Sequence, residues 1–168
     1  IMPILQKVIN DKNIRVYIEP FVGGANIIDK IKCDCRHGYD KSDTLIALLI
    51  QARDDFSKVL KEGSRELWDK GKGYVKDGIM PEDMTLADIG AMEFFASFSN
   101  RGYPGGYAKN TANRNYFKEA RANLEKQAPN LKGIIFHSGK YHELAHISGA
   151  VIYCDPPYAN TKQYGYAS

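Results

Sequence analysis

The stretch Val151-Ile-Tyr-Cys-Asp-Pro-Pro-Tyr158 runs a short apolar segment directly into an acid, two prolines and a second tyrosine. Its first four residues have the composition of a buried parallel β-strand, and the two prolines cannot continue a ladder of hydrogen bonds. We therefore expect Asp155 at the carboxyl end of a strand. In open α/β sheets, that edge is where ligands bind.

The chemistry of this turn favours an amino group on a flat ring as its ligand. Prolines lack an N–H donor and fix the backbone, so the carbonyl group of Pro156 can only accept hydrogen bonds. Together with the carboxylate of Asp155, it could accept both hydrogens of the amino group while Tyr158 stacks on the ring. The alternative is a loop that merely ends a strand.

A second motif, Val16-Tyr-Ile-Glu-Pro-Phe-Val-Gly-Gly-Ala-Asn26, also takes a strand into a glycine turn and then into a helix. Gly23 and Gly24 would let the backbone approach a ligand closely, and an acid about 20 residues later would reach a ribose hydroxyl group. Asp40 has that spacing. The turn lacks the third glycine of G-x-G-x-x-G, so a nicotinamide dinucleotide is the less favoured ligand.

The two motifs together, EPFVGGAN at 19–26 and DPPY at 155–158, resemble those of the Dam-type DNA adenine-N6 methyltransferases of prokaryotes and phages. The resemblance covers nearly the whole chain in order. It implies an α/β, Rossmann-like sheet that binds S-adenosylmethionine (SAM), with direct methyl transfer to an adenine flipped out of double-stranded DNA. By position it also implies three groups of site residues: a SAM turn of Glu19, Pro20, Phe21, Gly23 and Gly24, the ribose-binding Asp40, and an adenine clamp of Asp155, Pro156, Pro157 and Tyr158.

Three features depart from the pattern of these relatives. Ala25 stands where many of them have glycine, and Lys140 stands where an acid is common. Both ends of the chain also look clipped. At the start, the amphipathic helix expected at 1–9 begins with no capping residue before it. We therefore expect a methyltransferase domain that is truncated at both ends.

Length and composition indicate a single globular domain. The 168 residues are 43% hydrophobic and 26% charged, which is ordinary for a chain that buries a core. No apolar run is long enough to span a bilayer and no charged-then-apolar leader opens the sequence, so we expect a cytoplasmic protein. The three cysteines form no C-x-x-C pair, which suits a reducing compartment.

Residues 63–132 are expected to form a helical and loop insert that recognises the target DNA. Within it, residues 100–121 carry five basic residues against one acid, interleaved with tyrosines and glycines. Cations can neutralise phosphates, and aromatic faces can support unstacked bases. The alternative is a solvated surface loop. The residues expected to contact DNA are Arg101, Tyr103, Lys109, Arg114 and Lys118.

Two patterns could suggest a metal ion, and we expect neither to hold one. His142-Glu-Leu-Ala-His146 matches the H-E-x-x-H signature of zinc hydrolases, but no His or Glu follows it to supply a third ligand. Cys33, Cys35 and His37 are spaced two residues apart, so they could lie on one face of a strand as metal ligands. However, no fourth ligand with zinc spacing follows them.

Two alternatives to a DNA methyltransferase stay open. One is a nucleic-acid-binding relative that does not catalyse, and the other is an enzyme that methylates adenine in RNA.

Overall fold

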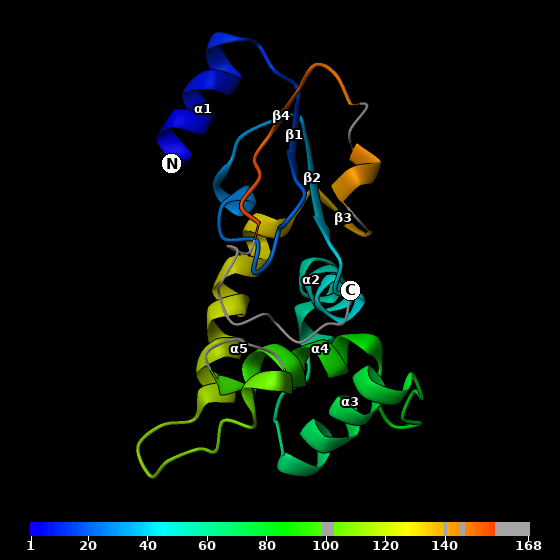
Figure 1. The fold of residues 1–168 in the computed structure, drawn as a ribbon. Helices are drawn as coiled ribbons and strands as arrows, with labels where there is room; N and C mark the ends of the chain where they lie inside the picture. Colours follow the sequence, from blue (N-terminus) through cyan, green and yellow to red (C-terminus); the bar gives the residue numbers. More distant parts are fainter. Residues whose placement is uncertain (99–102, 140, 145–146, 157–168) are drawn as a thin grey trace.

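The computed structural model, which describes residues 1–98, 103–139, 141–144 and 147–156, contains a parallel β-sheet, seen in the upper half of Figure 1. In these residues the sheet has four strands in the order β3-β2-β1-β4. Their bounds are Val16–Glu19 for β1, Cys35–Asp40 for β2, Ile134–Ser138 for β3 and Ala150–Ile152 for β4. All three pairings are parallel, and Ile18 lies opposite both His37 and Ile152. This sheet confirms the predicted α/β class.

The strand order changes direction between β1 and β4. Strands β1, β2 and β3 follow one another outward on one side, whereas β4 returns to the free side of β1. In doubly wound folds, such a reversal opens a crevice at the carboxyl ends of the two strands, and ligands bind there. The two sequence motifs follow β1 and β4, so both end at this point.

The helices of the described part are capped by the side chains that their sequences supply. Ser42 accepts a hydrogen bond from the Leu45 N–H group at the start of α2, and Thr85 forms a reciprocal capping box with Asp88 at the start of α4. Ser64 and Asn115 cap α3 and α5. The helical bounds are Met2–Asp11 for α1, Asp43–Asp54 for α2, Arg65–Asp77 for α3, Leu86–Phe95 for α4 and Tyr116–Gln127 for α5.

Helix α2 is shorter than its apolar spacing predicts. Apolar residues at helical spacing from Leu45 onward predict a helix that runs through Phe56, Val59 and Leu60, but α2 ends at Asp54. Asp55 adopts an extended conformation, and its side chain accepts a hydrogen bond from the Ser57 N–H group, which starts the short 3₁₀ turn η2 at Phe56–Lys58. The aspartate thus competes with the helix for backbone donors. Val59 is still buried, so it reaches the core without being helical.

Helices α3, α4 and α5 lie beyond the carboxyl ends of the strands and share one core with α2 and the sheet (Figure 1). Gly90 of α4 allows the closest approach, because a Cβ atom there would lie 2.2 Å from the backbone oxygen of Thr44 in α2. Trp68 and Met92 extend the core between these helices. No helix of the described residues is long and apolar enough to cross a bilayer.

Strand β4 is less buried than its composition predicts. Val151 is half-buried, Ile152 is 38% exposed and Cys154 is exposed. Among the described residues, β4 has a neighbouring strand only on the β1 side, so one of its edges and part of its face stay open. The strand is therefore parallel, as predicted, but not buried.

Candidate functional site

The two sequence motifs meet at the carboxyl ends of β1 and β4. The Tyr153 N–H group donates a hydrogen bond to the Ile18 carbonyl oxygen at 2.9 Å, which carries the pairing of the two strands one residue past β4. Asp155 follows, exposed, with the Tyr153 hydroxyl group 3.5 Å from its Oδ2 atom. It lies near enough to Glu19 for its charge to raise the pKa of that carboxyl group.

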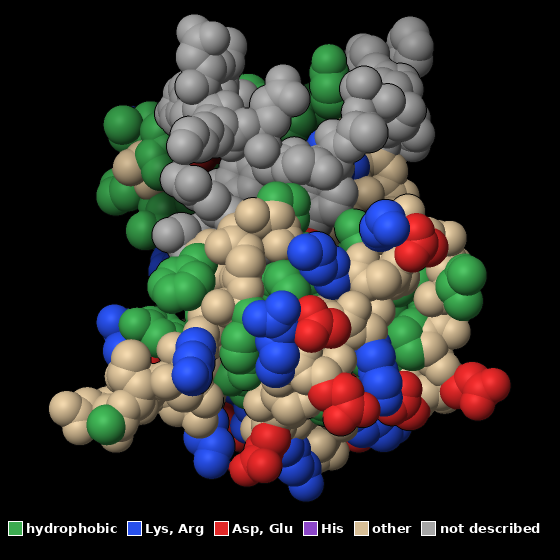
Figure 2. Space-filling view, turned by 60° about the horizontal axis from the view of Figure 1, so that its bottom comes forward, with side chains coloured by type: hydrophobic (Ala, Val, Ile, Leu, Met, Phe, Trp, Pro, Cys, Tyr) green, Lys and Arg blue, Asp and Glu red, His purple; other side chains and the backbone are tan. Residues whose placement is uncertain are grey.

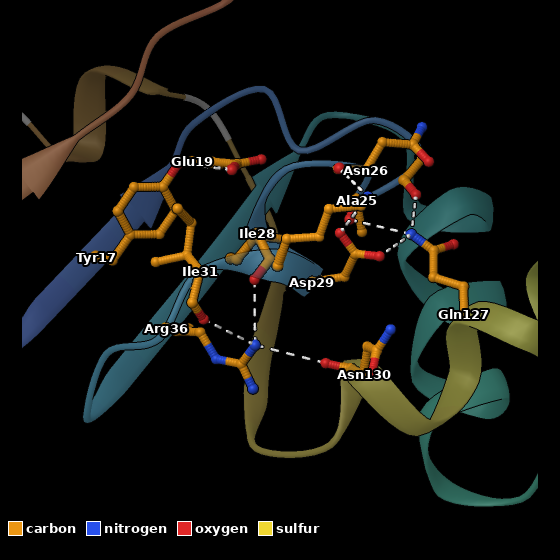
Figure 3. A network of polar contacts seen from close by, with 12 residues as sticks. Tyr17, Glu19, Ala25, Asn26, Ile28, Asp29, Ile31, Arg36, Gln127 and Asn130 are labelled. Carbon is orange, nitrogen blue, oxygen red and sulfur yellow. Dashed lines mark hydrogen bonds and ion pairs between the residues drawn. The ribbon is translucent and has the colours of Figure 1, made fainter. Parts of the chain in front are cut away.

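Glu19 is a buried carboxyl group at the end of β1. Its side chain accepts a 2.8 Å hydrogen bond from the Tyr17 hydroxyl group at Oε1 (Figure 3). Burial raises the pKa of Glu19 to about 7, and the nearby charges of Asp29 and Asp155 add to this, against the hydrogen bond from Tyr17 and the charge of Lys30. Near neutral pH both protonation states of this group are therefore populated, and a cationic ligand would favour its ionised form.

The glycine turn after β1 is bonded to the acid at the end of β2. The Gly23 N–H group donates to Oδ2 of Asp40 at 3.2 Å, and the Ser42 N–H group donates to Oδ1 at 3.0 Å. Gly23 has a φ of +47°, and a Cβ atom there would meet nothing within 4 Å, so its backbone faces open space. Before the turn, Pro20 is buried, and the half-exposed Phe21 ring lies 5.4 Å from the Tyr141 ring.

Ala25 carries strain in this turn. Its φ of +57° falls in the left-handed region, where an L side chain costs roughly 1–2 kcal/mol, yet its methyl group is fully buried. A non-glycine residue persists in such a conformation only when its surroundings hold it there. This is the position where the family resemblance leads one to expect glycine.

Gln127, at the end of α5, holds this turn, and it is not among the residues that the sequence motifs predict for the site. Its Nε2 atom lies 3.0 Å from the Gly24 carbonyl oxygen, 3.1 Å from that of Ala25 and 3.3 Å from Oδ2 of the buried Asp29 (Figure 3). Asp29 is also paired with Lys30 at 3.0 Å. A lone glutamine far along the chain gives no motif, so no pattern in the sequence could have identified it.

Part of the predicted adenine clamp and one predicted DNA contact lie outside the described residues. Asp155 and Pro156 are described and exposed. Pro157, Tyr158 and Arg101 are not among the described residues, and neither is Lys140.

The predicted DNA-binding residues that are described divide into two kinds. Lys109, Arg114 and Lys118 are exposed. Arg114 is paired with Glu119 at 2.9 Å, and Lys118 lies 3.4 Å from Glu62. We call the end of the molecule that α3, α4 and α5 form the helical end. Figure 2 shows basic and acidic side chains interspersed there, and no large area of one sign stands out.

Tyr103 is of the other kind, because the structure places it in the core. It is 3% exposed, its hydroxyl group donates to the Ile89 carbonyl oxygen at 3.0 Å, and its ring packs 5.3 Å from that of Trp68. Gly71 leaves room for it, since a Cβ atom there would lie 1.9 Å from the Tyr103 hydroxyl oxygen. In this conformation the ring cannot stack on a base, so we leave Tyr103 out of the proposed DNA contacts.

The described residues contain no cluster of three His, Cys, Asp or Glu side chains that could hold a metal ion. His37 instead bonds His137 of β3, with their ring nitrogens Nδ1 and Nε2 3.1 Å apart. The side chains of His142 and Glu143, and the whole of His146, lie outside the described part, so the H-E-x-x-H pattern stays untested.

Comparison with known protein families supports the function that the two motifs indicate. A family model for D12 class N6 adenine-specific DNA methyltransferases matches residues 1–167. A search among curated proteins finds no match.

Proposed function

The chain belongs to the D12 class of N6 adenine-specific DNA methyltransferases, which use SAM as methyl donor, and from this we propose which of its residues perform the reaction. We place the reaction at the carboxyl ends of β1 and β4. The observation that supports the proposal is the strand order, because the reversal between these two strands brings the glycine turn and the described start of the D-P-P-Y turn to the same edge of the sheet.

The chemistry of the described residues at this edge of the sheet suits SAM. Asp40 accepts hydrogen bonds from the backbone N–H groups of Gly23 and Ser42, and a carboxylate has further lone pairs that could accept from ribose hydroxyl groups. Glu19 would face the cationic methionine end, and its raised pKa lets it respond to a positive charge by ionising. Phe21 would line the pocket, and Gly23 leaves the backbone open to the ligand. SAM, when bound, supplies a methyl group on a positively charged sulfur that a nitrogen lone pair can attack.

Asp155 and the Pro156 carbonyl group would hold the amino group of the flipped adenine. Both accept its hydrogens, so the nitrogen lone pair is directed away from them, and the carboxylate stabilises the positive charge that develops on nitrogen during transfer. Pro157 would keep the turn rigid, and Tyr158 would stack on the base. No covalent bond to the enzyme is needed in this mechanism.

The test is transfer of labelled methyl groups from SAM to unmethylated double-stranded DNA, followed by nucleoside analysis. We expect N6-methyladenine from the wild-type protein and a rate lower by about 100-fold or more for Asp155→Ala, with SAM binding retained. Cys154→Ser is the matched control, because it changes the exposed neighbour and should leave the rate intact. Substantial methylation by Asp155→Ala would exclude this mechanism. Parallel reactions with RNA distinguish the substrates, and a protein that binds DNA without transfer would support the non-catalytic alternative.

We further propose that residues 63–132 recognise the target DNA, with Arg101, Lys109, Arg114 and Lys118 as contacts. The support is the exposure of the last three of these side chains on the helical end of the molecule. Positive side chains there would neutralise phosphates.

A further inference from the structure

Glu93 of α4 is a buried carboxyl group that the proposed reaction does not use. Its side chain is 0% exposed, and its Oε2 atom accepts a hydrogen bond from the Thr44 hydroxyl group at 2.8 Å. Its Oε1 atom has no hydrogen-bond partner among the described residues. Buried polar groups in native proteins are nearly always satisfied, so a carboxyl group kept in such a place calls for an explanation.

Hydrogen bonds connect Glu93, through Thr44 and Ser42, to Asp40, the acid of the proposed cofactor site. Because the Thr44 hydroxyl hydrogen goes to Glu93, the Ser42 hydroxyl group, 3.0 Å away, donates to Thr44. The Ser42 oxygen in turn accepts from the Leu45 N–H group at 3.2 Å, and the Ser42 N–H group donates to Oδ1 of Asp40 at 3.0 Å. Ser42 and Thr44 are both buried, so little water competes for these bonds.

The backbone is built to make this contact possible. Gly90 lets α4 lie directly on the first turn of α2, since any larger residue would clash with the Thr44 carbonyl group. Glu93 follows one helical turn later on the same face of α4, which carries its carboxyl group to the Thr44 hydroxyl group. Burial raises the pKa of Glu93 to about 7, with the charges of Asp43 and Asp40 adding and the hydrogen bond from Thr44 opposing. In either protonation state, Oε2 can accept from Thr44.

We propose that Glu93 is a positioning residue for the cofactor: through Thr44 and Ser42 it fixes the carboxylate of Asp40 in the orientation that receives the ribose hydroxyl groups. The inference rests on the role proposed above for Asp40. It also gives the helical insert a part in cofactor binding. Helix α4 ends at Phe95, shortly before the predicted DNA-binding segment in the sequence, and the Phe98 N–H group donates to the carbonyl oxygen of Gly106 in that segment at 3.0 Å.

The test is calorimetric titration with SAM of variants that break the chain without changing side-chain volume. Thr44→Val removes the bridging hydroxyl group and should weaken SAM affinity about tenfold, whereas Thr44→Ser should restore it. In an Asp40→Ala background, Thr44→Val should have no further effect, because its influence passes through Asp40. A merely structural role would lower affinity equally in both backgrounds.

Ser97→Ala is the matched control. Ser97 is also buried near the end of α4, and its hydroxyl oxygen accepts from Trp68 Nε1 at 3.0 Å, but no hydrogen bond links it to Asp40 among the described residues. This variant should lose stability and keep the SAM affinity of the wild-type protein. If Thr44→Val does not fold, Glu93→Gln and Glu93→Leu replace it, and only the leucine variant should bind SAM more weakly.

The outcomes separate this inference from the proposed function. Weak binding by Asp40→Ala together with wild-type binding by Thr44→Val, or additive losses in the double variant, would overturn the role of Glu93 alone. Wild-type binding by Asp40→Ala would remove Asp40 from the site, and the role of Glu93 with it.

Discussion

Two buried carboxyl groups, those of Glu19 and Glu93, make the stability of the fold depend on pH. The pKa values of Glu19 and Glu93 are raised from the ordinary 4.5 to about 7, chiefly by burial. A carboxyl group whose folded pKa is raised stabilises the fold fully below its unfolded pKa, and this contribution is lost as the pH rises through the folded pKa. The stability that each group contributes is therefore lost between about pH 4.5 and 7 as the pH rises.

The raised pKa of Glu19 predicts that the affinity of the protein for SAM depends on pH. Below its pKa of about 7 the group is mostly protonated, so binding of a cation must release a proton. Affinity should therefore rise with pH, by up to about tenfold per unit between roughly pH 5 and 7, and level off above. Glu19→Gln should flatten the curve at the low affinity, as measured by calorimetry at several pH values.

Tyr17→Phe provides a directional control for this prediction. The hydrogen bond from the Tyr17 hydroxyl group lowers the pKa of Glu19, so its removal should move the midpoint of the affinity curve to higher pH. A midpoint that stays in place, or a wild-type curve that is flat across this range, would remove Glu19 from contact with the cationic end of SAM.

At the scale of elements, the end of α5 determines the shape of the turn after β1. Gln127 contributes one amide nitrogen to the carbonyl oxygens of Gly24 and Ala25, on a turn that holds Ala25 in a strained conformation. Gln127→Ala would leave these carbonyl groups without that donor. We expect a loss of about 1–3 kcal/mol in the free energy of unfolding and a weaker SAM affinity.

Denaturant unfolding and SAM titration of Gln127→Ala measure both effects. Lys126→Ala is the matched control, because Lys126 is an exposed neighbour in the last turn of the same helix. It should change neither quantity. Wild-type SAM affinity in Gln127→Ala would show that the turn keeps its shape without α5.

At the scale of the whole molecule, the distribution of charge decides how DNA is held. The net charge of +3 is small, so binding must depend on local cations rather than on the overall field. Two of the proposed DNA-binding side chains, Arg114 and Lys118, have acidic partners within the protein. Phosphates must therefore compete with Glu119 and Glu62 for these side chains.

Replacing Lys109, Arg114 and Lys118 together by alanine should flatten the dependence of DNA affinity on salt. Each ion pair with a phosphate that the substitutions remove should reduce the slope of log affinity against log salt by up to about one. SAM affinity should not change. DNA titrations at several salt concentrations measure the slope.

The control is an equal reduction of positive charge at the other end of the molecule. Replacement of Lys7, Lys12 and Arg15, which lie in or just after α1, removes three cations far from the helical end (Figure 1). If both triple variants give the wild-type slope, Lys109, Arg114 and Lys118 do not contact DNA.

The class of fold and the two motifs of the proposed site follow from local patterns in the sequence. An apolar run that meets prolines or glycines is expected to end a strand, so the positions of Glu19 at the end of β1 and of Asp155 just after β4 were predictable. These features depend on neighbours within a few residues, and such local rules can be recognised in the sequence. The family resemblance, which the match over residues 1–167 confirms, depends on the same two motifs.

The distant residues that contact those motifs and their neighbours could be identified only once the chain was folded. Gln127 reaches Gly24 across 103 positions of the chain, and Glu93 reaches Thr44 across 49. Tyr103 lies in the core because Gly71 and Trp68 make room for its ring, although its own segment has the composition of a surface loop. Nothing near these residues in sequence encodes such contacts, because they arise only when α4 and α5 pack against α2 and the turn after β1.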